Sequence, residues 1–293
     1  MNLKYVILSP VRNEADHLPR TIDSILSQSC RPSQWIVIND GSTDRTGEIL
    51  DQAASQTEWI TPVHLEDRGY RKSGAGVVEA LCIGLTSLQI SDWDFLVKLD
   101  GDVSFESDYF EACISEFEKV PRLGIGGGFV CHSTADGLVP EASDDPPFHV
   151  RGASKIYRRE CWDAIGGLIE QTGWDTMDEV KANMLGWETR SFPDIQLVHH
   201  KQTGAADGDW KNAVKNGFGS YLTGYHPLFL VARCVKRANV KPYVVHSLGL
   251  LTGFIGGYVR RSPRLQEEEV TRYIRRQQLR RLFGKSSIYR PFD

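Results

Sequence analysis

The chain has 293 residues, of which 41% are hydrophobic and 25% are charged, and its formal net charge is −4. This composition excludes an intrinsically disordered chain and provides enough apolar residues for one large domain, alone or with a C-terminal appendage. The mildly acidic balance argues against nucleic acid as the main ligand, because duplex binding normally requires a broad basic face.

The first hundred residues alternate between strand-like and helical patterns. An apolar run at residues 5–8 is typical of a buried strand, and apolar residues follow at helical spacing over residues 18–26. Because such alternation recurs, we expect an α/β fold with a mostly parallel central sheet and flanking helices. In open sheets of this kind, ligands bind beyond the carboxyl ends of the strands. The further elements are predicted, in chain order, at residues 35–38 (strand), 49–53 (helix), 60–65 (strand), 77–88 (helix) and 95–99 (strand).

Two carboxylates directly follow the last of these strands. Asp100 and Asp102 lie two positions apart on an extended backbone, so both side chains can face the same way, and Gly101 lets the chain turn between them. Such a pair suits one hard cation bound together with phosphate oxygens. The same spacing recurs at residues 92–94 and 207–209, but only the first pair ends an apolar strand. We therefore predict a metal site there.

Beyond this point the regular alternation ends. Residues 109–117 have a helical apolar face, residues 149–157 look extended, and residues 175–185 look helical, with Gly186 as a stop signal. We expect this second half to cover the crevice at the carboxyl edge of the sheet.

The C-terminal part combines apolar stretches with a basic tail. Residues 221–235 and 243–259 are largely apolar, but the second, with 17 residues, barely reaches the minimum for a bilayer span, so a crossing is not expected. From Arg260 onward, ten lysines and arginines stand against four acids. Residues 264–282 can form a helix that either lies on an anionic membrane surface or packs on the main domain as an ordinary charged helix.

Three polar motifs lie where predicted strands end. They are Ser-Pro-Val-Arg-Asn-Glu at residues 9–14, Asn-Asp-Gly-Ser-Thr-Asp at residues 39–44, and Asp100-Gly101-Asp102. Together they resemble family 2 glycosyltransferases of the GT-A fold, of the bacterial envelope and exopolysaccharide type. The resemblance covers roughly residues 1–200, and the second motif is the most specific of the three. Taken alone, that motif could be a turn followed by a helix cap.

The resemblance implies a nucleotide-sugar donor bound by these motifs. Asp100 and Asp102 would hold the ribose and a Mn²⁺ or Mg²⁺ on the diphosphate, because a hard divalent ion screens phosphates that carboxylates alone would repel. Carboxylates can also accept hydrogen bonds from base N–H groups and ribose hydroxyls. The residues implied to line the nucleoside pocket are Pro10, Arg12, Glu14, Asp40 and Ser42.

Basic residues and a histidine extend this implied site. Arg68, Arg71 and Lys72 could neutralise the donor diphosphate, with no preference among the three, or could be solvated surface cations. GT-A enzymes often supply a late histidine or acid to the metal or diphosphate, and His200, which follows an apolar strand, would complete the metal ligands. A structural or substrate-contacting histidine is the alternative.

The resemblance also implies inversion at the sugar carbon, which requires a base to deprotonate the acceptor hydroxyl. In the family this base usually comes from a Glu-Asp pair that starts a helix, about a dozen residues before a glycine and an aromatic residue. Asp175 matches the Asp ahead of Gly186-Trp187, but Trp174 replaces the Glu. We favour Asp175 as the base over Asp178 or Glu179. The alternative is that these acids only complement the dipole of the first helical turn.

These inferences predict an inverting, metal-dependent glycosyltransferase that moves a sugar from a nucleotide-diphosphate donor to a saccharide or lipid-linked acceptor. Residues 1–215 would form the GT-A domain and residues 216–293 a helical, partly apolar and basic extension. The cysteines show no metal-type pairing and no signal peptide precedes residues 5–8, so we expect a cytoplasmic protein. Binding of the extension to an anionic membrane would place it on the inner face of the plasma membrane.

Two other functions stay open from the sequence. A sugar-1-phosphate nucleotidyltransferase has a related sheet, but it normally carries a Gly-rich phosphate loop after the first strand, where this chain has Pro10-Val11-Arg12-Asn13. A catalytically inactive nucleotide-sugar-binding protein would bind the donor without turning it over. The intact acidic motifs argue against this second alternative.

Overall fold

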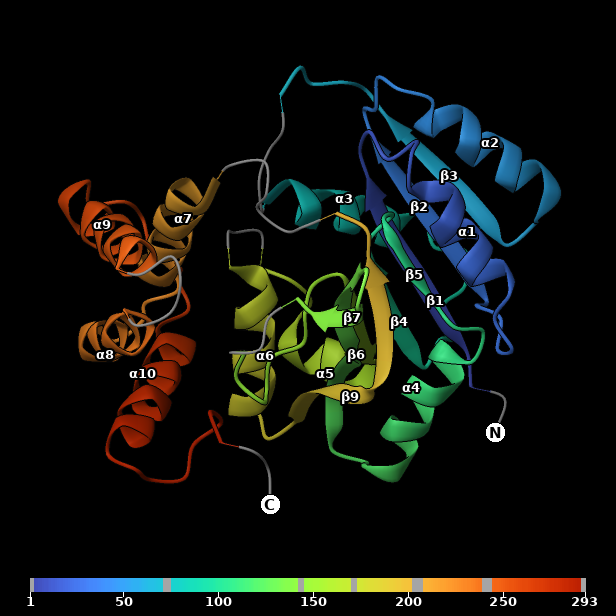
Figure 1. The fold of residues 1–293 in the computed structure, drawn as a ribbon. Helices are drawn as coiled ribbons and strands as arrows, with labels where there is room; N and C mark the ends of the chain where they lie inside the picture. The colour runs from blue at the N-terminus through green and yellow to red at the C-terminus, as the bar shows by residue number, and fades with distance from the viewer. Residues whose placement is uncertain are drawn as a thin grey trace.

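The structure, a computed structural model, describes residues 3–70, 75–141, 145–169, 173–201, 208–238 and 244–290. Figure 1 shows a central sheet with helices on both faces, and α7 to α10 gathered at one side of it, beyond α6. The strands are β1 (Tyr5–Val11), β2 (Gln34–Asp40), β3 (Ile60–Leu65), β4 (Phe95–Leu99), β5 (Val103–Phe105), β6 (Leu123–Thr134), β7 (Gly137–Pro140), β8 (Ser154–Arg158) and β9 (Glu188–His199). The helices are α1 (Leu18–Leu26), α2 (Thr46–Gln56), α3 (Ala75–Thr86), α4 (Tyr109–Lys119), α5 (Arg159–Ile165), α6 (Trp174–Met184), α7 (Gly208–Leu222), α8 (Pro227–Arg237), α9 (Val245–Val259) and α10 (Glu268–Leu282).

The strands and helices predicted in the first hundred residues are confirmed. In the described residues, one sheet has the strand order β3-β2-β1-β4-β8-β6-β9-β5, with β7 paired to β6. Strands β1 to β4 are mutually parallel where they pair, as repeated strand–helix units require. Strand β8 then runs antiparallel to both β4 and β6, while β6 and β9 are parallel to each other. The predicted α/β sheet is therefore parallel on one side and mixed on the other.

The register brings the carboxyl ends of three strands to one edge. Val11 of β1 lies opposite Asn39 of β2, and β1 also pairs with β4, whose last residue is Leu99. Residues 9–14, 39–44 and 100–102 therefore meet at that edge, as the sequence predicted.

The core lies in two layers, one on each face of the sheet. Alternate residues of β2 show this: Val37 belongs to the layer that contains α1, α2 and α4, whereas Ile36 and Ile38 belong to the layer that contains α3, α5 and α6. This alternation follows from the two-residue period of a strand. Both faces of the central strands are covered, so the strands are mainly apolar, with the buried Lys98 of β4 and Lys155 of β8 as exceptions.

Helices α7, α8 and α9 pack into one group, and α10 contacts both that group and α6. Helix α9 lies directly against α7, because Gly253 is so close to Val214 that a Cβ there would lie 1.9 Å from its carbonyl oxygen. Helix α10 is the basic helix predicted at residues 264–282, and its apolar residues Val270 and Ile274 pack with Met177 of α6. The structure thus matches the second predicted role of this helix, packing on the main domain.

The predicted boundary between residues 215 and 216 falls inside α7. We propose that the extension begins at α7, since this helix packs against α9. None of the helices in the described ranges combines the length and the apolar character needed to span a membrane.

Candidate active site

The first two motifs are joined by hydrogen bonds at the carboxyl edge of the sheet. The backbone N–H of Asn13 donates to Ser42 Oγ at 2.9 Å, and that of Thr43 donates to Asn13 Oδ1 at 2.8 Å. Asn13 has a φ of 55°, a left-handed conformation that asparagine tolerates better than most residues. The N–H of Glu14 donates to Thr46 Oγ1 at 2.8 Å. The two loops therefore form one surface rather than two independent turns.

Arg12 and Asp40 lie at the centre of this surface. Arg12 Nη1 donates to the carbonyl oxygen of Asp40 at 2.5 Å, and its Nη2 lies 2.6 Å from Asp67 Oδ1. Arg68 forms an ion pair with the Asp40 carboxylate. Burial raises the pKa of Asp40, and the charges of Arg68 and Arg12 oppose that rise. Gly41 has a φ of 66° and a Cβ there would lie 2.6 Å from Asp67 Cα, so glycine is required.

Of the remaining predicted donor-site residues, the structure describes Pro10 but not Lys72. Pro10 lies in β1 opposite Ile38 of β2 and is partly exposed at the same edge. Lys72, together with Arg71, lies outside the described residues. Of the three predicted diphosphate cations, the structure describes Arg68 alone.

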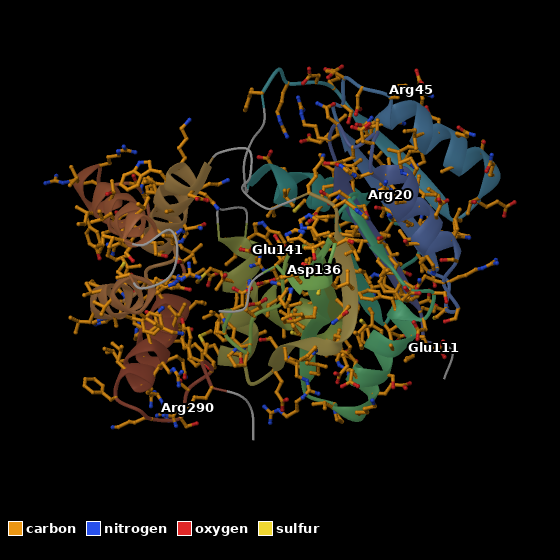
Figure 2. All side chains as sticks on the ribbon, viewed as in Figure 1. Arg20, Arg45, Glu111, Asp136, Glu141 and Arg290 are labelled. Carbon is orange, nitrogen blue, oxygen red and sulfur yellow. The ribbon has the colours of Figure 1, made fainter. Side chains whose placement is uncertain are left out.

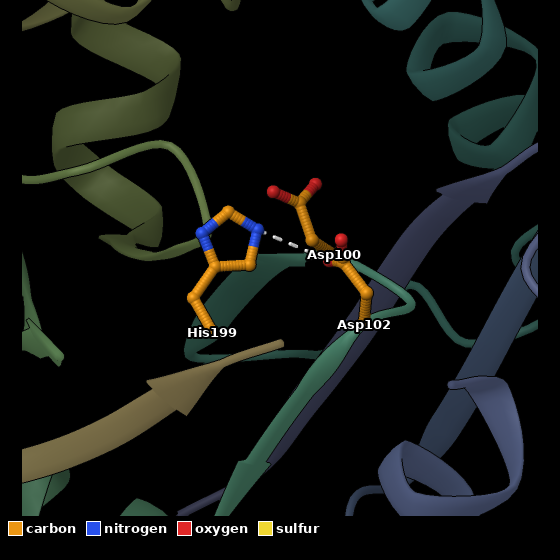
Figure 3. A group of neighbouring side chains, drawn as sticks. All are labelled: Asp100, Asp102 and His199. Atoms are coloured by element: carbon orange, nitrogen blue, oxygen red, sulfur yellow. Dashed lines mark ion pairs between the residues drawn. The ribbon is translucent and has the colours of Figure 1, made fainter. Parts of the chain in front are cut away.

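Among the described residues, one group of three acidic, histidine or cysteine side chains could hold a metal ion. It consists of Asp100, Asp102 and His199. One ligand atom from each lies within 4.8 Å of the others. Figure 3 shows the imidazole ring facing both carboxylates across the end of the sheet, and His199 Nε2 lies 3.3 Å from Asp102 Oδ1. The other ring nitrogen, Nδ1, lies 3.1 Å from Oε2 of Glu141, whose side chain is labelled in Figure 2. An outer carboxylate of this kind fixes the orientation of a metal-binding imidazole.

The charges of this cluster are strongly coupled. Burial raises the pKa of Asp100, and the neighbouring Asp102 adds to that rise while Lys98 opposes it. Burial would also raise the pKa of Asp102, but the hydrogen bond and charge of His199 outweigh it and lower the pKa. Burial alone would lower the pKa of His199, yet its hydrogen bonds to Asp102 and Glu141 raise the pKa to about 10. Metal binding here would replace the proton on His199.

The predicted ligand His200 lies elsewhere. Its Nε2 is 2.9 Å from Ser104 Oγ, its Nδ1 is 3.4 Å from Arg20 Nη1, and its ring stacks on His17. Neighbouring residues at the end of β9 point to opposite faces, so only one of the two histidines can reach the aspartates. The structure brings His199 to the cluster, which corrects the prediction by one residue. Leu197 is buried two residues before His199, so the alternation along β9 was the signal that could have indicated His199 rather than His200.

Two lysines of the site were not predicted from the sequence. Lys98 lies within β4, is buried, and places its Nζ 2.5 Å from Asp100 Oδ1 while donating also to the carbonyl of Gly152. Lys201 Nζ lies 2.5 Å from Glu14 Oε2. Both cations therefore sit beside predicted acidic site residues, and nothing in their local sequence indicates this.

Two of the three candidate bases are buried in an ion-pair network. Asp178 Oδ2 and Glu179 Oε1 each lie 2.8 Å from Lys155 Nζ, and none of the three side chains is exposed. Tyr157 donates to Asp178 at 2.6 Å, and the Val150 N–H donates to Glu179 at 2.7 Å. Burial raises the pKa of Asp178 to about 6, against the opposing charge of Lys155. An acceptor hydroxyl cannot reach carboxylates enclosed in this way.

Asp175, the favoured base, lies in the first turn of α6 and is partly exposed. Its backbone carbonyl accepts a hydrogen bond from Lys155 Nζ at 2.5 Å. A Cβ added at Gly152 would lie 4.0 Å from Asp175 Cβ, and the carbonyl of Gly152 contacts Lys98, the partner of Asp100. Asp175 is thus linked to the cluster of Asp100, Asp102 and His199 through Gly152 and Lys98.

The sheet topology and the acidic cluster at its edge agree with the predicted GT-A fold. The solved structure of the mannosyltransferase PcManGT from Pyrobaculum calidifontis, in complex with GDP-Man and Mn²⁺, has a TM-score of 0.55 at 17% identity and covers 97% of this chain and 76% of its own. At this identity the similarity concerns the fold alone, and it confirms the predicted GT-A architecture.

A family model described as glycosyl transferase family 2 matches residues 6–169, so the chain belongs to that family. It is 26% identical to glycosyltransferase GlyA of Streptococcus pneumoniae over 157 residues, which are 53% of this chain and 20% of GlyA. It is also 26% identical to poly-beta-1,6-N-acetyl-D-glucosamine synthase of Staphylococcus aureus over 113 residues, which are 38% of this chain and 25% of the synthase. The chain thus spans a fifth to a quarter of the length of these curated relatives.

Proposed function

We propose that this protein is an inverting, divalent-cation-dependent glycosyltransferase that transfers a sugar from a nucleotide-diphosphate donor to a hydroxyl of a saccharide or lipid-linked acceptor. The observation that carries the proposal is the cluster of Asp100, Asp102 and His199 at the carboxyl edge of the sheet. Family membership supports it, as does a neighbour of the same fold whose structure contains GDP-Man and Mn²⁺.

The donor set of the cluster suits the proposed cation. Two carboxylates and one imidazole are acceptable to Mn²⁺, and Mg²⁺ uses the same carboxylates with more water. We infer that Asp100, Asp102 and His199 hold one such ion, with Glu141 orienting the imidazole. The bound ion would supply positive charge that stabilises the departing nucleoside diphosphate.

The joined motif surface would bind the nucleoside part of the donor. The Asp40 carboxylate can accept hydrogen bonds from a base N–H or a ribose hydroxyl, and Arg12 fixes its backbone through the bond described above. Pro10, Glu14 and Ser42 would complete the pocket. Lys72 stays a candidate for the diphosphate.

Asp175 would act as the base. Its carboxylate takes the proton of the acceptor hydroxyl while the acceptor oxygen forms a bond to the anomeric carbon. The bond from that carbon to the diphosphate oxygen breaks, and its electron pair leaves with the nucleoside diphosphate. Attack from the face opposite the leaving group inverts the configuration. Asp178 and Glu179 would instead hold α6 in place through Lys155, because both are enclosed.

The acceptor class is proposed from the relatives. The name of the poly-beta-1,6-N-acetyl-D-glucosamine synthase supports polysaccharide synthesis. The acceptor would then be a growing or lipid-linked saccharide on the cytoplasmic side of the membrane.

The test is a screen of UDP-, GDP- and dTDP-sugars with and without Mn²⁺, run with saccharide acceptors and, in parallel, with pyrophosphate, and analysed for all nucleotide products. Release of a nucleoside diphosphate that depends on Mn²⁺ supports the proposal. Formation of nucleoside triphosphate from sugar nucleotide and pyrophosphate would identify a nucleotidyltransferase instead. Binding of donor with no turnover in the presence of saccharide acceptors would identify an inactive binding protein.

A further inference from the structure

Helices α8 and α9 expose a row of large apolar side chains. On α8, Leu228, Val231 and Val235 are 61%, 50% and 68% exposed. On α9, Leu248, Ile255 and Val259 are 50%, 55% and 76% exposed. These six residues are called the α8–α9 face below. Exposed apolar groups of this extent mark an interaction surface when they are contiguous.

The two rows lie on the same side of the helix pair. The helices run antiparallel, because Ser247 near the start of α9 donates to the carbonyl of Cys234 near the end of α8 at 2.8 Å. On α8 the exposed Val235 follows the buried Cys234 by one position, and on α9 the exposed Leu248 follows the buried Ser247 in the same way. Antiparallel helices are related by a two-fold axis perpendicular to their common plane, so equal offsets point to the same side. The six side chains therefore form one continuous face.

The opposite side of this helix pair is already occupied. Helix α9 rests on α7 through Gly253, as described above, and Leu230 of α8 packs with Leu250 and Phe254 of α9 in the interior of the group. Figure 1 shows α8 and α9 on the side of the extension that is farther from the sheet. A partner on the α8–α9 face would therefore leave the candidate active site open.

The charges around the face are mostly positive, with Asp209 of α7 close enough to His246 of α9 to act on its charge. Residues 210–266, which include both helices, contain nine lysines and arginines and no aspartate or glutamate. Lys236, Arg260 and Arg261 are exposed at the ends of the two rows. A second copy of this chain would bring the same positive charges to the contact, which repel each other. An anionic lipid surface offers the complementary charge together with an apolar layer for the exposed side chains.

We propose that the α8–α9 face docks on an anionic lipid bilayer, with its six apolar residues inserted below the headgroups and the surrounding cations paired with lipid phosphates. This assigns membrane binding to α8 and α9 rather than to the basic helix α10, whose apolar residues are used against α6. The inference does not rest on the proposed transfer activity.

The experiment is vesicle co-sedimentation of the full chain. Vesicles of phosphatidylcholine alone are compared with vesicles that contain about one third phosphatidylglycerol. We expect binding to the anionic vesicles and at least roughly tenfold weaker binding to the neutral ones. The variant Val235→Glu/Ile255→Glu should lose about tenfold or more of its partitioning into anionic vesicles, since each change removes inserted apolar area and adds a repelled charge. Both positions are exposed, so the fold should tolerate the change.

The matched control is Leu26→Glu/Leu185→Glu, which adds the same charges at exposed leucines of α1 and at the end of α6. Both variants change the net charge by the same amount. Apart from the effect of that charge, the control should bind vesicles as the unmodified chain does. Equal loss in both variants, or no binding to anionic vesicles, would overturn the proposal. Self-association in analytical ultracentrifugation that the α8–α9 variant abolishes would overturn it too, by assigning the face to a second copy.

Discussion

Lys155 and Asp178 form a fully buried ion pair, with Nζ 2.8 Å from Oδ2, directly beneath the helix turn that carries Asp175. The same Nζ donates to the carbonyl of Asp175 at 2.5 Å and lies 5.6 Å from the ring centre of Trp174. A cation that contacts the backbone of the candidate base and two buried carboxylates fixes where α6 begins. The ion pair thus links the stability of the domain to the placement of Asp175.

Replacing Lys155 tests this link. Lys155→Met should lower the free energy of unfolding by about 3–5 kcal/mol, because Asp178 and Glu179 are left buried without their cation. Urea unfolding followed by circular dichroism measures the change. As a control, Lys119→Met removes an exposed lysine paired with Glu116 and should leave the urea midpoint nearly unchanged. Equal midpoints for the two variants would show that the buried network does not stabilise the fold.

Asp175→Asn should abolish transfer while sparing donor binding. An asparagine cannot accept the acceptor proton, so kcat should fall by roughly 10²–10⁴-fold with little change in the KM for donor. Initial rates at varied donor concentration separate the two parameters. Asp163→Asn, at an exposed acid of α5, is the control and should be fully active. Normal turnover by the Asp175 variant would remove that residue from the role of base.

The two adjacent histidines form a matched pair for the metal site. His199→Ala should weaken Mn²⁺ binding at least as much as the roughly 10–100-fold that loss of an outer-shell partner costs. His200→Ala should not change it, since that side chain contacts Ser104 and Arg20 instead. Calorimetric titration of Mn²⁺ into each variant, with nucleoside diphosphate present, gives both affinities. A larger loss in the His200 variant would restore the original sequence prediction.

The pH dependence of stability follows from His149 and Glu179, whose Nδ1 and Oε2 lie 2.9 Å apart. Burial alone would lower the pKa of His149, but the charge and hydrogen bond of Glu179 outweigh it and raise the pKa above the ordinary 6.5. The protonated form is therefore stabilised by folding. Its contribution is complete below the unfolded pKa and is lost as pH rises through the higher folded pKa.

Comparison with His149→Gln isolates this contribution. The difference in unfolding free energy between the unmodified chain and the variant should shrink as pH rises from about 5 to about 9. Urea titrations at several pH values measure it. A difference that stays constant or grows with pH would contradict the assigned protonation.

Glycine is required where α9 meets α7. Gly253→Ala should destabilise the extension by about 1–3 kcal/mol or more, because its Cβ would overlap the carbonyl oxygen of Val214. Gly256 of the same helix has no atom within 4 Å of an added Cβ, so Gly256→Ala should raise stability by about 0.5–1 kcal/mol. Thermal unfolding compares the pair. The same sign of change for both variants would show that the close contact of the two helices is wrong.

Local sequence patterns predicted the first half of the fold well. Strands β1, β2 and β4 contain apolar runs, β3 is a weaker one, and the helices between them carry apolar residues at helical spacing, so the local sequence is enough to predict these elements. The convergence of Asp40 with Asp100 followed from sheet topology alone. By contrast, apart from the local hairpin of β6 and β7, the strands from β5 to β9 pair between distant segments, such as Val103 with His199, and no local pattern encodes those partners.

The same distinction applies to the site. The pairing of Asp100 with Asp102 was predictable because both follow one strand. The histidine of the cluster was predicted as His200 instead of His199, because the direction in which a side chain points at the end of a strand depends on the strand's partners. Lys98 and Lys155 are charged residues inside apolar strands, and only the tertiary structure reveals the carboxylates that compensate them. The enclosure of Asp178 and Glu179 depends on those lysines and could not be read from α6 itself.

The central claim is that Asp100, Asp102 and His199 hold a divalent cation against the diphosphate of a nucleotide-sugar donor. Calorimetric titration of UDP, GDP and dTDP into the protein, with and without Mn²⁺, tests it most directly, with Asp102→Asn in parallel. The account predicts that Mn²⁺ strengthens binding of at least one nucleotide and that the variant loses this enhancement. Nucleotide affinity that is independent of Mn²⁺, or enhancement that survives in the variant, would contradict it.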